Sequence, residues 1–141
     1  MKQTILKSIN EQINAEFYSS YLYLSMSAWA NNKGYKGIAH WLEIQAKEEH
    51  AHAMKFYMYV QERNEKPVFS KIDEPASDWN GIIDLYEAVY THEQKITDLI
   101  NNLYSLAHDE KDHATGTFLQ WFINEQVEEE AQLADILQKL E

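Results

Sequence analysis

Glu49 and His52 stand three residues apart in the segment Lys47-Glu48-Glu49-His50-Ala51-His52. On a helix this spacing places both side chains on one face, where a carboxylate oxygen and an imidazole nitrogen can bind the same cation. A Glu-x-x-His pair alone is a weak signal, but these two residues occupy positions in a run that steps by four and three residues, which is typical of the inner face of a helix bundle. The run is Ile38, Leu42, Gln45, Glu49, His52, Phe56 and Tyr59.

Three other segments show the same stepping, and each is interrupted by a carboxylate. No lysine or arginine occupies any of the four runs. For one such Glu alone the ordinary interpretation is a solvated surface carboxylate, but burial without a counter-charge would cost several kcal/mol, and the coincidence of four runs therefore favours a bound metal. Oxygen ligands with a single nitrogen favour iron or manganese, and carboxylates that can bridge favour two ions. The runs are Ile5, Ile9, Gln12, Glu16, Ser19, Tyr23, Met26 and Ala30; Ile82, Tyr86, Val89, Glu93, Ile96, Ile100 and Leu103; and Leu119, Phe122, Gln126, Glu129, Leu133, Ile136 and Leu140.

Composition sets the class of protein. With 141 residues, 45% of them hydrophobic, four Gly and two Pro, the chain is predicted to form a single all-α domain over residues 1–141. The absence of cysteine excludes disulfides and thiolate metal sites. The first residues lack the apolar core of a signal peptide and no apolar run approaches a membrane span, so we expect a soluble, cytoplasmic protein without a membrane partner. A net charge of -11 disfavours nucleic acid as a partner.

Four helices are expected, with a long segment between the second and third. That segment, residues 65–80, holds both prolines and has no helical period, and it can carry the chain along the whole bundle so that the second and third helices run parallel. We predict a four-helix bundle with one long crossover. The first helix is expected from Thr4, a candidate N-cap, to about Asn31, and the second begins after Gly37, which closes the turn, and fades at Arg63-Asn64. The third is expected from about Gly81 to His108, and the fourth continues to Glu141 with Asp109 or Asp112 as its cap.

Several residues near the predicted ligands could also carry chemistry. Tyr23 follows Glu16 by two turns, and it either donates a hydrogen bond or an electron to the metals or simply packs in the core. Trp121, beside the ligands of the fourth helix, is a weaker candidate for such a role. In the acidic cluster of the fourth helix, we interpret Glu130 as solvated. The remaining carboxylates of that cluster suggest a peripheral metal site formed by Glu48, Glu125 and Glu128 near Glu129.

The chain closely resembles the bacterial non-haem ferritins over all four helices. The resemblance is carried by the segments 14–23 (NAEFYSSYLY), 48–52 (EEHAH) and 119–130 (LQWFINEQVEEE), together with Glu93. It implies a ferritin-like bundle and an oxidase that uses O2 to convert Fe(II) to Fe(III). A second Glu-x-x-His, as in bacterioferritins, is absent from the fourth helix, and no haem is expected. The resemblance implies a first iron site formed by Glu16, Glu49 and His52, and a second formed by Glu93, Glu129 and the bridging Glu49. It places Gln126 and Tyr23 beside this pair of sites. It also implies a third iron site, formed by Glu48, Glu125, Glu128 and Glu129.

The resemblance implies iron storage and detoxification, with Fe(II) and O2 as reactants and ferric mineral held in a homo-oligomeric shell of 24 subunits. Two alternatives remain open: a di-iron oxidase of an organic substrate, which bulky residues such as Phe17 and Phe56 weakly disfavour, and a passive iron-binding helical scaffold. Family members usually continue into a short fifth helix that lines four-fold channels, whereas this sequence ends at Glu141. We therefore expect a bacterial-type ferritin that lacks this helix, with iron oxidation intact and a wider opening in its shell wherever four chain ends meet.

Overall fold

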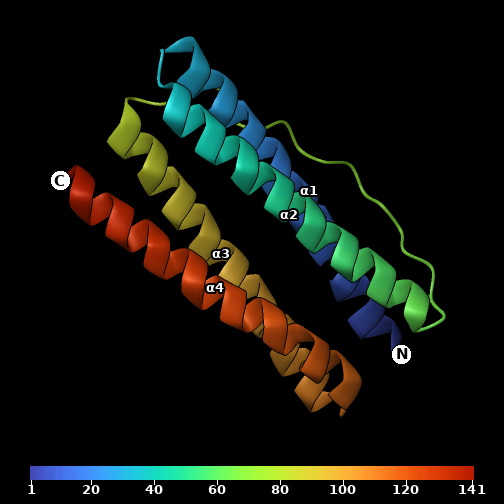
Figure 1. Cartoon of the computed structure of the whole chain (residues 1–141). Helices are drawn as coiled ribbons and strands as arrows, with labels where there is room; N and C mark the ends of the chain where they lie inside the picture. Colours follow the sequence, from blue (N-terminus) through green and yellow to red (C-terminus); the bar gives the residue numbers. More distant parts are fainter. The chain divides into compact units, whose positions relative to one another are not determined.

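The computed structural model describes residues 1–141 as four α-helices and no strands, which confirms the all-α prediction. The helices are α1 (Gln3–Asn32), α2 (Lys36–Glu62), α3 (Ile82–Asp109) and α4 (His113–Leu140), shown in Figure 1. Two compact units contain them. The first unit, Leu6–Trp79, holds α2, most of α1 and most of the long loop, and the second unit, Met1–Ile5 with Asn80–Glu141, holds α3, α4 and the first residues of α1. That the chain forms one domain over residues 1–141 stays a prediction.

The observed helix limits all fall within two residues of the expected ones; at the start of the second helix, Tyr35 rather than Gly37 precedes the first turn. Thr4 lies inside α1, so its prediction as an N-cap is wrong. The turn between α1 and α2 contains Gly34 at φ +88°, and α3 is preceded by Gly81 at φ +114°. Both backbone conformations are ones that residues with a side chain rarely adopt, and glycine therefore permits the chain to turn at these two points.

In the first unit, α1 and α2 form an antiparallel hairpin. The Ser20 hydroxyl donates to the main-chain oxygen of Ala46 at 2.7 Å, and the Ser27 hydroxyl donates to that of Ala39, also at 2.7 Å. The contacts advance along α1 as they recede along α2, which gives the direction of the pair. Serine and alanine permit the two backbones to approach closely, because a larger side chain would hold them apart.

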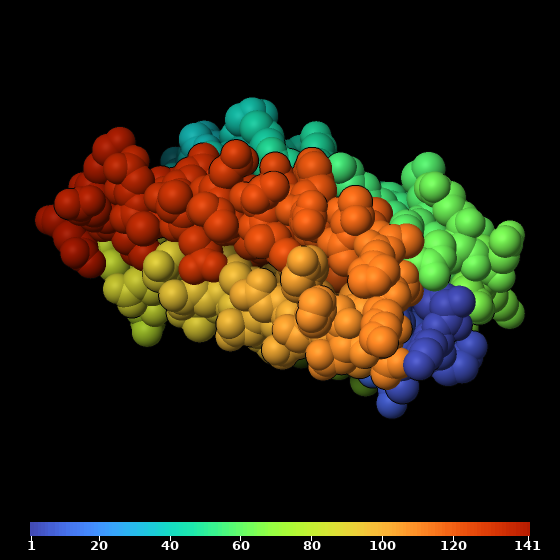
Figure 2. Space-filling view, turned by 90° about the horizontal axis from the view of Figure 1, so that it is seen from below, coloured from blue at the N-terminus to red at the C-terminus, as the bar shows by residue number.

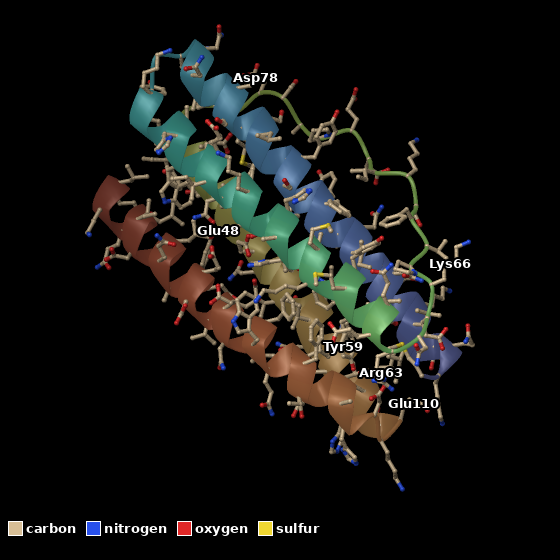
Figure 3. The ribbon with its side chains drawn as sticks, turned by 45° about the vertical axis from the view of Figure 1, so that its right-hand side comes forward. Glu48, Tyr59, Arg63, Lys66, Asp78 and Glu110 are labelled. Atoms are coloured by element: carbon tan, nitrogen blue, oxygen red, sulfur yellow. The ribbon has the colours of Figure 1, made fainter.

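The loop of residues 63–81 runs along α1 in the same direction as that helix. Figure 3 labels Lys66 near its start and Asp78 near its end, at opposite ends of the hairpin. Side chains of α1 hold it at successive points, so the loop returns the chain to the end of the hairpin at which α2 began. The long connection predicted between the second and third helices is thus confirmed. The contacts are Asn10 Oδ1 with Val68 N at 3.2 Å, Asn14 Nδ2 with the main-chain oxygens of Ser70 and Lys71 at 3.1 Å, Ser25 Oγ with Ala76 O at 2.6 Å, and Trp29 Nε1 with Asp78 Oδ1 at 2.9 Å.

In the second unit, α3 and α4 lie side by side along their length (Figures 1 and 2). Asp112 caps α4: its Oδ1 accepts a hydrogen bond from Thr115 N at 3.1 Å, and its Oδ2 accepts from the Thr115 hydroxyl at 2.8 Å. Of the two capping candidates in the sequence, the structure therefore selects Asp112, because Asp109 is the last residue of α3. Lys2 forms an ion pair of 2.6 Å with Glu110 at the turn.

Most of the core positions predicted from the four-three stepping are buried, including every member of the first run from Ile5 to Ala30. The exceptions lie at helix ends. Leu140 is 37% exposed, so its assignment to the core is wrong. Ile38, Tyr59, Ile82 and Ile136 are half-buried. None of the four helices combines the length and the apolar character that crossing a membrane requires.

Candidate metal centre

Three predicted ligands meet inside the α1–α2 hairpin. Glu16 projects from α1, and Glu49 and His52 project from α2, one turn apart as their spacing predicted. One ligand atom from each lies within 4.8 Å of the other two. His52 Nδ1 is 3.4 Å from Glu49 Oε2 and 3.8 Å from Glu16 Oε2. Two carboxylate oxygens and one imidazole nitrogen therefore converge on a space that a single cation could share.

The charge of this group favours a divalent cation. Glu16 and Glu49 are 0% exposed and His52 is 5% exposed. If His52 were protonated, the three side chains would still carry one net negative charge; with a neutral imidazole, the form that binds metals, they carry two. Leaving such charge buried costs several kcal/mol per ion, and a divalent cation would offset it.

One oxygen of the buried Glu16 carboxylate has no hydrogen-bond donor. Its Oε1 accepts a hydrogen bond from Gln12 Nε2 at 3.1 Å, one turn earlier on α1. Its Oε2 is buried and accepts no hydrogen bond. Because buried polar atoms in folded proteins are nearly always hydrogen-bonded, this oxygen has the properties of a metal ligand.

The second unit holds another set of predicted residues. Glu93 on α3 is 1% exposed, and on α4 Gln126 is 2% and Glu129 is 7% exposed. Gln126 Nε2 donates to Glu93 Oε2 at 3.0 Å and to the main-chain oxygen of Glu93 at 3.2 Å. The glutamine amide thus holds one oxygen of the Glu93 carboxylate in place.

Two polar residues of this unit were not predicted as part of the site. Gln126 Nε2 also lies 3.1 Å from the Thr97 hydroxyl, which in turn lies 2.6 Å from Glu130 Oε2. The interpretation of Glu130 as a solvated carboxylate is therefore wrong: it is half-buried and accepts a hydrogen bond from α3. The position of Thr97, one helical turn after Glu93, was the signal in the sequence that could have identified it.

The other predicted residues differ in exposure. Tyr23 is fully buried on α1, two turns from Glu16, whereas Glu48 and Glu128 are exposed and Glu125 is half-buried. Figure 3 shows Glu48 on α2. Trp121 is 40% exposed and packs edge-on against Phe122 with ring centroids 5.0 Å apart. The third metal site and a redox role for Tyr23 stay predictions.

Helical hairpins that bury carboxylates and a histidine around a cation position define the class of ferritin-like proteins. Residues 6–141 match the Ferritin family model, described as a ferritin-like domain, and the chain belongs to that family. The fold class is accordingly the all-α four-helix bundle of the ferritins, with its long connection between α2 and α3, and the protein is an iron storage protein.

The chain is similar to bacterial non-haem ferritins and to an archaeal ferritin. The chain is 41% identical over 140 residues to a probable bacterial non-heme ferritin-like protein of Haemophilus influenzae, covering 99% of this chain and 85% of that protein. It is 40% identical over 131 residues to the bacterial non-heme ferritin of Staphylococcus saprophyticus, covering 93% of this chain and 78% of that protein. Among solved structures, an open pore ferritin from Archaeoglobus fulgidus superposes with a TM-score of 0.98 at 44% identity, over 99% of this chain and 86% of that chain.

Proposed function

We propose that this ferritin is a ferroxidase that oxidises Fe(II) with O2 before the iron is stored. The observation that carries the proposal is the buried group of Glu16, Glu49 and His52, whose ligand atoms lie within 4.8 Å of one another. These three side chains bind one Fe(II). Their two negative charges match the charge of the ion, and three protein ligands leave coordination positions open for O2 and water.

A second Fe(II) is needed because O2 is reduced most readily by two electrons. We assign it to Glu49 as a bridging ligand with Glu93 and Glu129, whose burial makes each of these carboxylates a costly charge unless a cation accompanies it. Each Fe(II) gives up one electron, O2 accepts two electrons and two protons to form hydrogen peroxide, and two Fe(III) ions result. Gln126 positions the Glu93 carboxylate through the 3.0 Å hydrogen bond.

Two further roles complete the proposal for the site. Tyr23 is a buried phenol two turns from Glu16, and we assign it hydrogen bonding or electron donation to the centre. Glu48, Glu125 and Glu128, with Glu129, form a third and weaker iron site. Its carboxylates are more exposed than those of the buried pair and include no histidine, so its affinity should be lower. No haem takes part.

Storage requires an oligomer, because a ferric mineral stays in solution only inside a closed shell. We propose a cytoplasmic homo-oligomer of 24 subunits, as the family membership supports. Light scattering and electron microscopy of the purified protein test this directly. A chain that stays monomeric at every salt concentration would restrict its function to iron oxidation.

Stopped-flow absorbance after mixing the anaerobic Fe(II)-loaded protein with O2 tests the ferroxidase. The wild type should show a fast phase that consumes two Fe(II) per chain, and it should repeat this phase when excess Fe(II) is supplied. Glu49→Gln should lose the fast phase, whereas Glu43→Gln, which removes an exposed carboxylate from the same helix, should retain it. A fast phase of unchanged rate in Glu49→Gln would overturn the assignment, and a single turnover without repetition would indicate a passive iron-binding scaffold.

A further inference from the structure

We infer that Thr97 and Glu130 are positioning residues for Gln126 and, through it, for the iron-binding carboxylate of Glu93; this inference rests on the proposed function. The four side chains form a chain of hydrogen bonds within the α3–α4 unit. It runs from Glu130 Oε2 to the Thr97 hydroxyl at 2.6 Å, from there to Gln126 Nε2 at 3.1 Å, and from Gln126 Nε2 to Glu93 Oε2 at 3.0 Å.

The direction of each hydrogen bond follows from counting protons. The Thr97 hydroxyl has one proton and two acceptors within reach: Glu130 Oε2 at 2.6 Å and the main-chain oxygen of Glu93 at 3.0 Å. Hydrogen bonds from a hydroxyl to an ionised carboxylate are shorter and about twice as strong as neutral ones. The proton therefore points to Glu130. The Thr97 oxygen then presents only lone pairs toward Gln126.

This direction determines how the Gln126 amide is turned. Thr97 Oγ1, Glu93 Oε2 and the main-chain oxygen of Glu93 all act as acceptors toward Gln126, and only the NH2 end of an amide can donate to them. This group has two protons for the three acceptors, so one proton is shared between two of them. Without the Thr97–Glu130 pair, a freely rotating hydroxyl could donate to the amide oxygen as readily as it accepts from the NH2 group. The amide could then present its oxygen to the Glu93 carboxylate, with mutual repulsion. The two Glu93 acceptors already favour the NH2 end of Gln126, and Glu130 adds to this preference through Thr97 although it binds no iron itself.

The consequence for iron binding is specific. With Gln126 Nε2 engaged, Glu93 Oε2 is held by a neutral donor and its partner oxygen is directed to one position for a cation. Residues that orient metal ligands in this way typically contribute a factor of about 10–100 in metal affinity. The Glu16–Glu49–His52 group does not depend on this chain of hydrogen bonds, so loss of the hydroxyl should weaken one of the two iron positions and leave the other unchanged.

Anaerobic calorimetric titration with Fe(II) tests this inference in the variant Thr97→Val, which keeps the shape of the side chain and removes the hydroxyl. The wild type should bind two Fe(II) tightly per chain. In Thr97→Val, one of these should weaken about 10- to 100-fold while the other keeps its affinity. Thr97→Ser retains a hydroxyl and should restore the wild-type pattern. Glu130→Ala should weaken the same position, whereas Asp98→Asn, which removes an exposed charge beside Thr97, should not.

The outcomes separate this inference from the proposed function. If the wild type binds fewer than two Fe(II) tightly, the di-iron assignment itself fails. If the wild type binds two and Thr97→Val binds both with unchanged affinity, the di-iron assignment stands and the positioning role is overturned. An equal loss at both positions in Thr97→Val, without rescue by Thr97→Ser, would show a general structural effect and would also overturn it.

Discussion

Replacing Glu16 with Gln should stabilise the metal-free protein and at the same time remove its stabilisation by metal. In the wild type, Glu16 and Glu49 are both fully buried, and Oε2 of Glu16 accepts no hydrogen bond. Glutamine is nearly the same size and keeps an oxygen that can accept the hydrogen bond from Gln12 Nε2. The substitution therefore removes a buried charge without creating a cavity.

The size of this stabilisation follows from the free energy that burial of the Glu16 charge costs. An unsatisfied buried polar group costs about 1–3 kcal/mol, and more if it is charged. Part of this relief is offset by the lost attraction to His52, whose Nδ1 lies 3.8 Å from Glu16 Oε2. We expect a net increase of about 1–3 kcal/mol in the free energy of unfolding in EDTA. For chains slightly longer than this one, each kcal/mol raises the Tm by about 2–4 °C.

When a divalent metal is bound, the wild type should be more stable than Glu16→Gln. A ligand that binds only the folded state at 100 times its Kd stabilises that state by about 2.7 kcal/mol. The wild type should gain this with Zn(II), which binds similar ligands without being oxidised, whereas Glu16→Gln has lost one of three ligands and should gain little. Thermal unfolding followed by circular dichroism, at one protein concentration, measures the Tm of both proteins in EDTA and in Zn(II). Glu11→Gln, an exposed change on α1, should shift stability by no more than about 0.5 kcal/mol in either condition.

The reasoning would be refuted if Glu16→Gln unfolded at a lower temperature than the wild type in EDTA. That result would mean that the Glu16 charge is neutralised within the protein and does not await a cation. Equal stabilisation of both proteins by Zn(II) would likewise show that Glu16 is not a ligand.

Three other features lead to separate predictions. Burial raises the pKa of the Tyr86 phenol above its ordinary value of 10.0. The stability that the neutral phenol contributes is therefore complete below pH 10.0 and is lost as the pH rises through the higher pKa of the folded state. Tyr86→Phe should make the decline in stability at alkaline pH shallower in urea titrations. Asp112→Ala should cost about 1 kcal/mol of unfolding free energy because it removes the cap of α4, while Asp109→Ala should cost less in the same denaturant titration. Asp78→Ala removes the acceptor for Trp29 Nε1 and should increase hydrogen exchange in residues 63–81, whereas Asp78→Asn, which keeps an acceptor oxygen, should not; equal exchange in the two variants would contradict this.

The sequence predicted the helices and the ligands on the α1–α2 hairpin well, for a local reason. Helical periodicity determines which face a side chain occupies, and Glu16, Glu49 and His52 all stand at core-facing steps of four and three residues. The same periodicity predicted the burial of Glu93 and Glu129. It was wrong at Leu140, because periodicity indicates the face of a helix on which a residue lies and not how exposed the last turn of that helix is.

Capping and hydrogen-bond partners were decided by the three-dimensional structure. Asp109 and Asp112 were equal candidates in the sequence, and only the path of the turn brings Asp112 to Thr115 N. Glu130 lies next to Glu129 in a run of acids, and nothing in its neighbours distinguishes it from a solvated carboxylate. Its partner Thr97 is 33 residues away on another helix.

The sequence alone thus determined which residue types stand on the inner face of each helix, since a repeat near 3.6 residues and the chemistry of the side chains are both local properties. Only the tertiary structure decided which of these side chains meet. The contact between Thr97 and Glu130 depends on the axial offset and rotation of α3 against α4, and the path of residues 63–81 depends on partners spread along α1. These quantities result from packing between segments distant in the chain, and no single segment encodes them.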